Sequence, residues 1–104
     1  MVRYALASDL TLERKFGVSH LVITERRIGV CDAERPVRWV GLAGIKELEM
    51  DELFGSARLT ATGSGGTEVL IYYTKALVPQ FGVLYRVVNQ ELRGLAPVLP
   101  EEDE

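Results

Sequence analysis

Aliphatic residues flank three consecutive charges in the stretch LVITERRIGV, residues 21–30. This pattern predicts two antiparallel strands joined by a turn at Glu25 and Arg26, because charged residues are expected where a chain reverses in water. With that turn, direct cross-strand pairing places four aliphatic side chains on one face of the hairpin: Leu21, Ile23, Ile28 and Val30. We therefore interpret the charges as part of a turn and not as a catalytic or phosphate-binding cluster.

A second hairpin is predicted around GSGG, residues 63–66, which separates the strand-like stretches RLTAT and EVLIYYT. Alternation along these strands gives one inward face, formed by Ala57, Leu59, Ala61, Val69, Ile71 and Tyr73. The outward face is formed by Thr60, Thr62, Glu68 and Tyr72. A phosphate-binding loop would need a helix after it, with a Lys and a Ser or Thr at fixed spacing, and here a strand follows. We therefore interpret GSGG as a turn.

Two shorter segments also have the composition of strands. Leu10 to Phe16 is interpreted as a strand that Gly17 ends. Val37 to Val40 is interpreted as a short strand after a turn at Glu34–Pro36.

The run from Ile45 to Leu53 has two possible interpretations. Its helix-forming residues favour a helix. Its apolar positions do not continue at a regular 3.6-residue period through Met50 and Phe54, which favours an irregular strand. Both interpretations stay open here, and we favour the strand.

The clearest element is an amphipathic helix predicted from Ala76 to about Arg93. Apolar side chains recur at helical spacing and define the face expected to pack on the sheet: Phe81, Leu84, Tyr85, Val88 and Leu92. Pro79 suits the first turn, where a missing N–H costs little, and Gly94 is suited to end the helix. The sequence thus predicts a single domain of residues 1–95, followed by an acidic flexible tail of residues 96–104.

Composition and charge narrow the function classes. The 104 residues are enough for one domain, and 47% hydrophobic with 26% charged residues is typical of a globular protein. No apolar run reaches the roughly 18 residues of a membrane span. The single cysteine, Cys31, cannot form an internal disulfide, which favours a reducing, cytoplasmic setting. A net charge of −3 argues against a nucleic-acid partner bound through a basic face.

The sequence contains few of the side chains that enzymes use as nucleophiles, bases or metal ligands. The one histidine, His20, follows Ser19 on a predicted strand, where neighbouring side chains point to opposite faces and cannot act as a nucleophile and base. Cys31 has no second cysteine nearby for a zinc site. Four acids lack the spacing of a calcium loop: Glu47, Glu49, Asp51 and Glu52. We expect no enzyme activity, no cofactor and no metal.

Several short motifs resemble one known family. TERRI, residues 24–28, is similar to the second hairpin of bacterial pleckstrin-homology-like (PH-like) domains, and VRWVGLAGIKELEM and LYRVVNQEL resemble their later parts. More narrowly, ERKFGVSHLVITERRIGV, LFGSARL and YYTKALVPQFGVLYRVVNQ resemble a soluble N-terminal region of some bacterial ABC exporters. The resemblance implies an α+β fold, a PH-like antiparallel β-barrel or sandwich of about six to seven strands closed by one C-terminal amphipathic helix. It also implies a binding or regulatory module.

The same resemblance implies a basic site for an anionic ligand or lipid head group. The candidate residues lie on the first strand and the first hairpin tip: Arg14, Lys15, Arg26 and Arg27. The alternative is a solvated hairpin tip, because charged turns are expected without any ligand.

A second candidate surface lies on the helix. Val83 and Val87 fall on the side opposite the predicted core stripe, close to Pro79. Isolated exposed valines are ordinary, but a row of them one turn apart can seat a neighbouring protein or a second copy of the chain. We therefore expect a non-catalytic cytoplasmic interaction or assembly module, an accessory part of a membrane transport system. The alternative is a sensor of a ligand or anionic lipid head group, with direct membrane contact weak or made through a partner.

Overall fold

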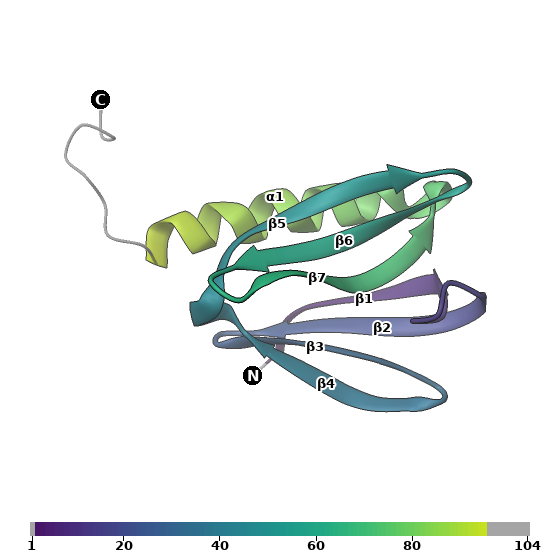
Figure 1. Ribbon diagram of the computed structural model, residues 1–104, viewed down its shortest axis with the longest axis horizontal. Coiled ribbons are helices and arrows are strands. Elements are labelled where there is room, and N and C mark those ends of the chain that lie inside the picture. Colours follow the sequence, from purple (N-terminus) through teal and green to yellow (C-terminus); the bar gives the residue numbers. More distant parts are fainter. Residues whose placement is uncertain (1, 96–104) are drawn as a thin grey trace.

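The computed structural model describes residues 2–95, which form an α+β fold of seven antiparallel strands in two sheets and one C-terminal helix (Figure 1). Sheet A has the order β1-β2-β3-β4 and sheet B the order β5-β6-β7. The strands are β1 (Val2–Leu10), β2 (Phe16–Thr24), β3 (Arg27–Asp32), β4 (Arg35–Gly41), β5 (Ile45–Leu53), β6 (Ser56–Gly63) and β7 (Gly66–Thr74). Two 3-10 turns, η1 (Leu42–Gly44) and η2 (Lys75–Leu77), precede β5 and the helix α1 (Val78–Leu95).

The first predicted hairpin is confirmed. Leu21 lies opposite Val30 and Ile23 lies opposite Ile28, with the turn at residues 25–26. All four side chains are buried. This inward face of sheet A packs against sheet B, and both sheets contribute to one hydrophobic core.

The second hairpin is confirmed in position, with a change of register. A bulge between Leu59 and Thr60 shifts the pairing of β6 with β7, so that Thr60 lies opposite Val69. The pairing of β6 with β5 stays regular here, so Thr60 keeps its predicted place on the face opposite Leu59 and Ala61, although it is buried. The prediction that Val69 points inward is wrong, because the bulge places it opposite Thr60. Leu70 is also buried, whereas Val69 is only half-buried. A bulge changes which side chains face inward, because strand faces alternate with a period of two.

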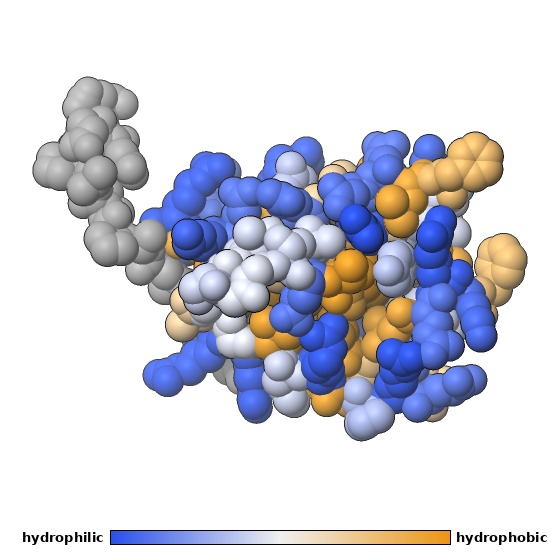
Figure 2. Space-filling model, viewed as in Figure 1, coloured by the Kyte–Doolittle hydropathy of each residue, from blue (hydrophilic) through white to orange (hydrophobic). Residues whose placement is uncertain are grey.

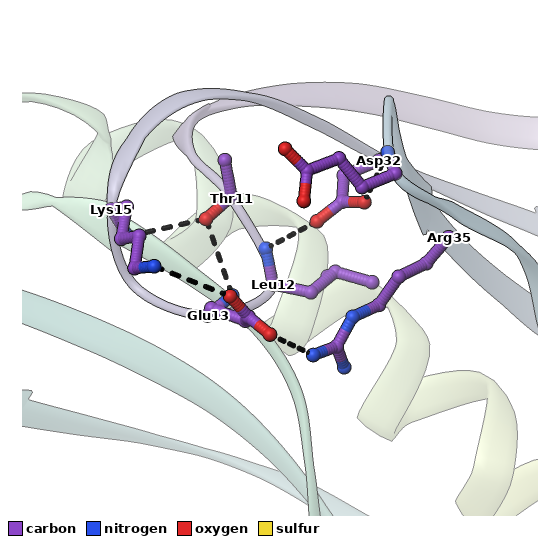
Figure 3. Close-up of polar contacts among 7 residues, drawn as sticks. Thr11, Leu12, Glu13, Lys15, Asp32 and Arg35 are labelled. Atoms are coloured by element: carbon purple, nitrogen blue, oxygen red, sulfur yellow. Dashed lines mark hydrogen bonds and ion pairs between the residues drawn. The ribbon is translucent and has the colours of Figure 1, made fainter.

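The predicted strand from Leu10 to Phe16 is wrong. Leu10 ends β1, Phe16 begins β2, and the residues between them form the turn. The Thr11 amide donates to the Lys15 carbonyl at 2.7 Å, and Arg14 has a left-handed backbone with φ of 69°. The Thr11 hydroxyl also accepts bonds from backbone amides of this turn (Figure 3). A threonine side chain that bonds nearby backbone competes with strand formation.

The other predicted elements are confirmed as strands. The ambiguous run from Ile45 to Leu53 is β5, and the predicted strand from Val37 to Val40 is part of β4. The turn predicted at Glu34–Pro36 is wrong in position, since it lies at residues 33–34 and β4 already begins at Arg35. Among residues 2–95, no strand pairing joins the two sheets into a closed barrel.

Helix α1 follows the predicted pattern on its buried face. Phe81, Leu84, Val88 and Leu92 are buried, and Tyr85 packs at the edge of the core. The Phe81 ring stacks on Tyr73 of sheet B, with centroids 4.0 Å apart. The prediction that Gly94 ends the helix is wrong, since α1 continues through it to Leu95. A glycine allows a helix to end but does not force it to.

Residues 96–104, the predicted acidic tail, lie outside the described residues. Within residues 2–95, no helix has both the length and the apolar composition needed to span a bilayer.

Candidate functional site

The helix residues predicted to form an interface border a groove between α1 and β1. The groove has a volume of about 340 Å³. Its β1 wall is formed by Arg3, Tyr4, Ala5 and Leu6, and its α1 wall by Gln80, Val83, Leu84 and Val87. Val83 is 54% exposed and Val87 is half-buried. Pro79 is exposed one turn before Val83 and is not part of the lining.

A polar cluster joins the two walls. The Glu91 carboxylate of α1 accepts a bond of 2.7 Å from the Tyr4 hydroxyl and one of 2.6 Å from the Arg3 guanidinium. The bond from Tyr4, assisted by Arg3, holds the pKa of Glu91 below its usual value, although partial burial opposes this shift. The same carboxylate raises the pKa of Arg3 and that of Tyr4. These bonds fix the separation between helix and strand.

The strand wall of the groove is an unpaired sheet edge. β1 lies at the edge of sheet A and pairs only with β2. Its C-terminal half is tied to β7, because the Ser8 hydroxyl donates to the Tyr72 carbonyl and Asp9 accepts bonds from Thr74. Within residues 2–95, the segment Val2–Leu6 makes backbone hydrogen bonds to no strand other than β2. Its outward N–H and C=O groups are therefore available to a further strand.

On the other side of α1, the sheet edge is closed. The Asn89 side chain bonds both the N–H and the C=O of Leu48 in β5, the edge strand of sheet B. The helix thus closes one edge with an amide side chain and leaves a groove beside the other. This difference distinguishes β1 from β5 as a place for a partner strand.

A larger groove of about 530 Å³ lies between β4 and β7. Arg38 crosses it, with bonds to the Glu68 carboxylate at 2.6 Å and to the Val69 carbonyl at 3.1 Å. This side chain occupies an acceptor of β7 and links the two strands. An arriving strand would have to displace it, so this groove is less accessible to backbone pairing than the one beside β1.

The four basic candidates do not form one site. Arg14 and Lys15 lie in the β1–β2 turn, whereas Arg26 and Arg27 lie at the β2–β3 turn, and the nine residues of β2 separate the two pairs (Figure 1). At about 3.3 Å per residue this is roughly 30 Å, too far for one head group to contact both pairs.

The individual contacts of these residues also differ. Lys15 lies 3.6 Å from Glu13, which in turn bonds Arg35 across the turn (Figure 3). The Arg27 guanidinium stacks over the Trp39 ring at 4.2 Å. These partners lower the net positive charge beside Lys15 and orient Arg27 along the sheet surface.

Sequence reasoning missed two exposed aromatic side chains. Phe16 is 92% exposed and Phe54 is 100% exposed. Phe16 begins β2 directly after the β1–β2 turn, and Phe54 lies in the β5–β6 turn. These two turns lie at the same end of the molecule (Figure 1). Figure 2 shows hydrophobic side chains projecting there from a largely hydrophilic surface. The sequence does contain one signal for Phe16: it directly follows two basic residues, Arg14 and Lys15, which are expected at the surface.

The candidate catalytic residues do not converge. Ser19 is buried and donates to the Leu10 carbonyl at 2.7 Å, whereas His20 is exposed on the opposite face of sheet A. Cys31 is half-buried. The described residues contain no group of three or more His, Cys, Asp or Glu side chains arranged for a metal ion.

Comparison of the chain with protein-family models, with curated proteins and with solved structures finds no match. The contacts within the chain are therefore the basis of the functional assignment.

Proposed function

We propose that the chain is a non-catalytic interaction module that binds an extended segment of a partner protein in the groove between β1 and α1. The observation that carries this proposal is the free edge of Val2–Leu6, which faces an apolar wall formed by Val83, Leu84 and Val87. Strand addition uses these two parts: the edge supplies backbone hydrogen bonds and the wall contacts alternate side chains.

The geometry favours an extended segment over a helix. A strand added to β1 lies about 4.8 Å from it, and every second side chain then points to one face. Those side chains contact Leu84 and Val87, so the ligand is expected to carry apolar residues at alternate positions. Burying apolar surface contributes roughly 25 cal/mol per Å² before the cost of ordering the ligand.

The wider setting follows from the sequence resemblance. The order of four strands, three strands and a closing helix supports a PH-like fold. A domain of this kind, with an open strand edge, fits an accessory or regulatory role beside a cytoplasmic part of a membrane transport system.

The test is a display selection of random linear peptides on the full chain, followed by affinity measurements on the enriched peptides. Val83→Glu should weaken binding at least tenfold, because it places a charge on the apolar wall, about 1.4 kcal/mol or more. Arg86→Gln makes the same change in net charge at an exposed position of α1 outside the groove lining, and should leave affinity unchanged. The absence of enriched peptides, or equal binding by the two variants, would overturn the proposal.

A second candidate function is contact with an anionic membrane surface. Phe16 and Phe54 are exposed at one end of the molecule, with Arg14 and Lys15 beside Phe16. Aromatic side chains insert at membrane interfaces and basic residues are attracted to anionic lipid. Sedimentation with phosphatidylserine vesicles should then be salt-sensitive and lost in a Phe16→Ser, Phe54→Ser double variant. Equal sedimentation with neutral vesicles, or none, would exclude this candidate.

A further inference from the structure

The outer face of sheet A carries a band of apolar side chains. Antiparallel sheets with one solvated face usually alternate hydrophobic-in and polar-out. The outward positions of β2 carry Val18 and Val22 together with His20 and Thr24. Those of β3 carry Gly29 and Cys31 together with Arg27, and Trp39 lies beside Gly29 on β4. Val18, Val37 and Trp39 are among the exposed large hydrophobic side chains of residues 2–95.

Cross-strand pairing makes this face continuous across the sheet. Ala5, Val22, Gly29 and Trp39 lie opposite one another in a single row over all four strands. In the next row, Ala7 and His20 lie opposite each other, and Cys31 lies opposite His20. His20 is the only polar side chain in these two rows.

The face is also flat around Trp39, because the indole ring lies along the sheet surface and does not project from it. A Cβ atom on Gly29 would be 2.7 Å from the nearest atom of the Trp39 ring, so the indole covers Gly29. Arg27 stacks on the same ring. A flat apolar sheet face matches another such face, because two sheets pack face to face with their side chains forming a shared core.

We infer that two copies of the chain pack against each other through this face, which goes beyond the proposed function and uses a different surface. Charge permits the contact: the chain carries a net charge of −3, but no outward position of β2, β3 or β4 holds a carboxylate. A two-fold dimer through these three strands therefore brings no acid against its own copy, and self-complementary contacts are the usual form of a homodimer.

The area of the face agrees with a reversible dimer. Four strands about 4.8 Å apart, each of about eight residues at about 3.3 Å per residue, cover roughly 500 Å². Two such faces bury roughly 1,000 Å², the lower limit of a specific interface. The dimer is therefore expected to dissociate on dilution.

The test is the light-scattering mass of the full chain over a hundredfold concentration range. The mass should rise with concentration to twice the chain mass of 11.6 kDa. Val18→Glu should hold it at the monomer value. Val83→Glu is a matched control, because the two valines are 53% and 54% exposed, and it should leave the dimer intact. A wild-type monomer at every concentration, or a dimer that Val18→Glu does not affect, would overturn the inference.

Cys31 provides a second measurement without any substitution. It is the only cysteine in the chain and lies on this face. The rate at which a maleimide modifies its thiol should fall in proportion to the monomer fraction as the concentration rises. A rate that does not change while the mass doubles would place the dimer contact elsewhere. The two surfaces are separable, since Val18→Glu should keep peptide binding and Val83→Glu should keep the dimer.

Discussion

The side-chain amide of Asn89 bonds the backbone of Leu48 in both directions. The Leu48 N–H donates to Asn89 Oδ1 at 2.7 Å, and Asn89 Nδ2 donates to the Leu48 carbonyl at 2.9 Å. An amide side chain on the helix thus makes the pair of bonds that a neighbouring strand would make. It fixes α1 on sheet B and leaves the groove on the opposite side of the helix, beside β1.

Replacing Asn89 by alanine should destabilise the fold. Both Leu48 groups lose their partner, and we expect the free energy of unfolding to fall by roughly 1–3 kcal/mol in urea denaturation. Gln90→Ala is the control, since Gln90 is an exposed neighbour on α1. Alanine favours helix more than asparagine does, so helix propensity acts against the predicted loss. Equal stability of the two variants would show that this pair of bonds does not hold the helix in place.

Gly29 should not tolerate a side chain, because Trp39 covers it. Gly29→Ala places a Cβ 2.7 Å from the indole and should push the ring outward. The fluorescence of the only tryptophan should shift to the red, with a loss of about 1–3 kcal/mol in stability. Gly41→Ala is the control, since a Cβ there meets nothing within 4 Å. An unchanged emission spectrum for Gly29→Ala would contradict the packing of Trp39 on β3.

Gly63 marks a close approach between two backbones. A Cβ at this position would lie 1.9 Å from the Gly44 carbonyl oxygen, at the junction of η1 and β5 with the β6–β7 hairpin. Backbone cannot move aside as a flexible side chain can, so Gly63→Ala should cost at least about 2 kcal/mol in thermal or urea unfolding. Gly65→Ala, in the same hairpin, meets no atom within 4 Å and should be nearly neutral. Similar costs for both would argue against this contact.

Asp9 should make stability depend on pH in the acid range. Burial raises its pKa, but bonds from the Thr74 hydroxyl and amide outweigh this and lower it below the usual value. The charged form is therefore favoured by folding. The stability that the Asp9 carboxylate contributes is complete above its pKa in the unfolded chain, about 3.9. It is lost as the pH falls through the lower pKa of the folded protein. The stability difference between wild type and Asp9→Asn should be constant above about pH 5 and shrink as the pH falls to about 2. A difference that stays constant down to that pH would contradict this role.

The hairpins could be predicted because their signals are local. Leu21, Ile23, Ile28 and Val30 sort to one face through a turn of two residues, and the stripe of α1 repeats within one helix. The Thr11 turn was missed because LTLERKF has an apolar residue at each end, and only the threonine hydroxyl shows that the chain reverses. No residue pattern in the sequence predicts the bulge at Leu59 and Thr60, where the pairing of β6 with β7 shifts.

The groove could be predicted only on its helix side. Val83 and Val87 follow from helical periodicity, but the opposite wall is the N-terminal strand, whose sequence VRYALASDL mixes polar and apolar residues without a clear period. The bond between Arg3 and Glu91 joins residues 88 positions apart. No local pattern indicates that the first strand and the last helix lie side by side, because that arrangement depends on how the two sheets pack.

The most direct test of the proposed docking site is amide hydrogen exchange with and without a display-selected peptide. The Leu48 amide should already be protected in the free protein, because Asn89 accepts its hydrogen bond. On peptide binding, outward amides of Val2–Leu6 should gain protection, while exchange in β4 and β7 stays unchanged. Protection gained in β4 and β7, with none in β1, would contradict the assignment of the β1 edge as the binding site.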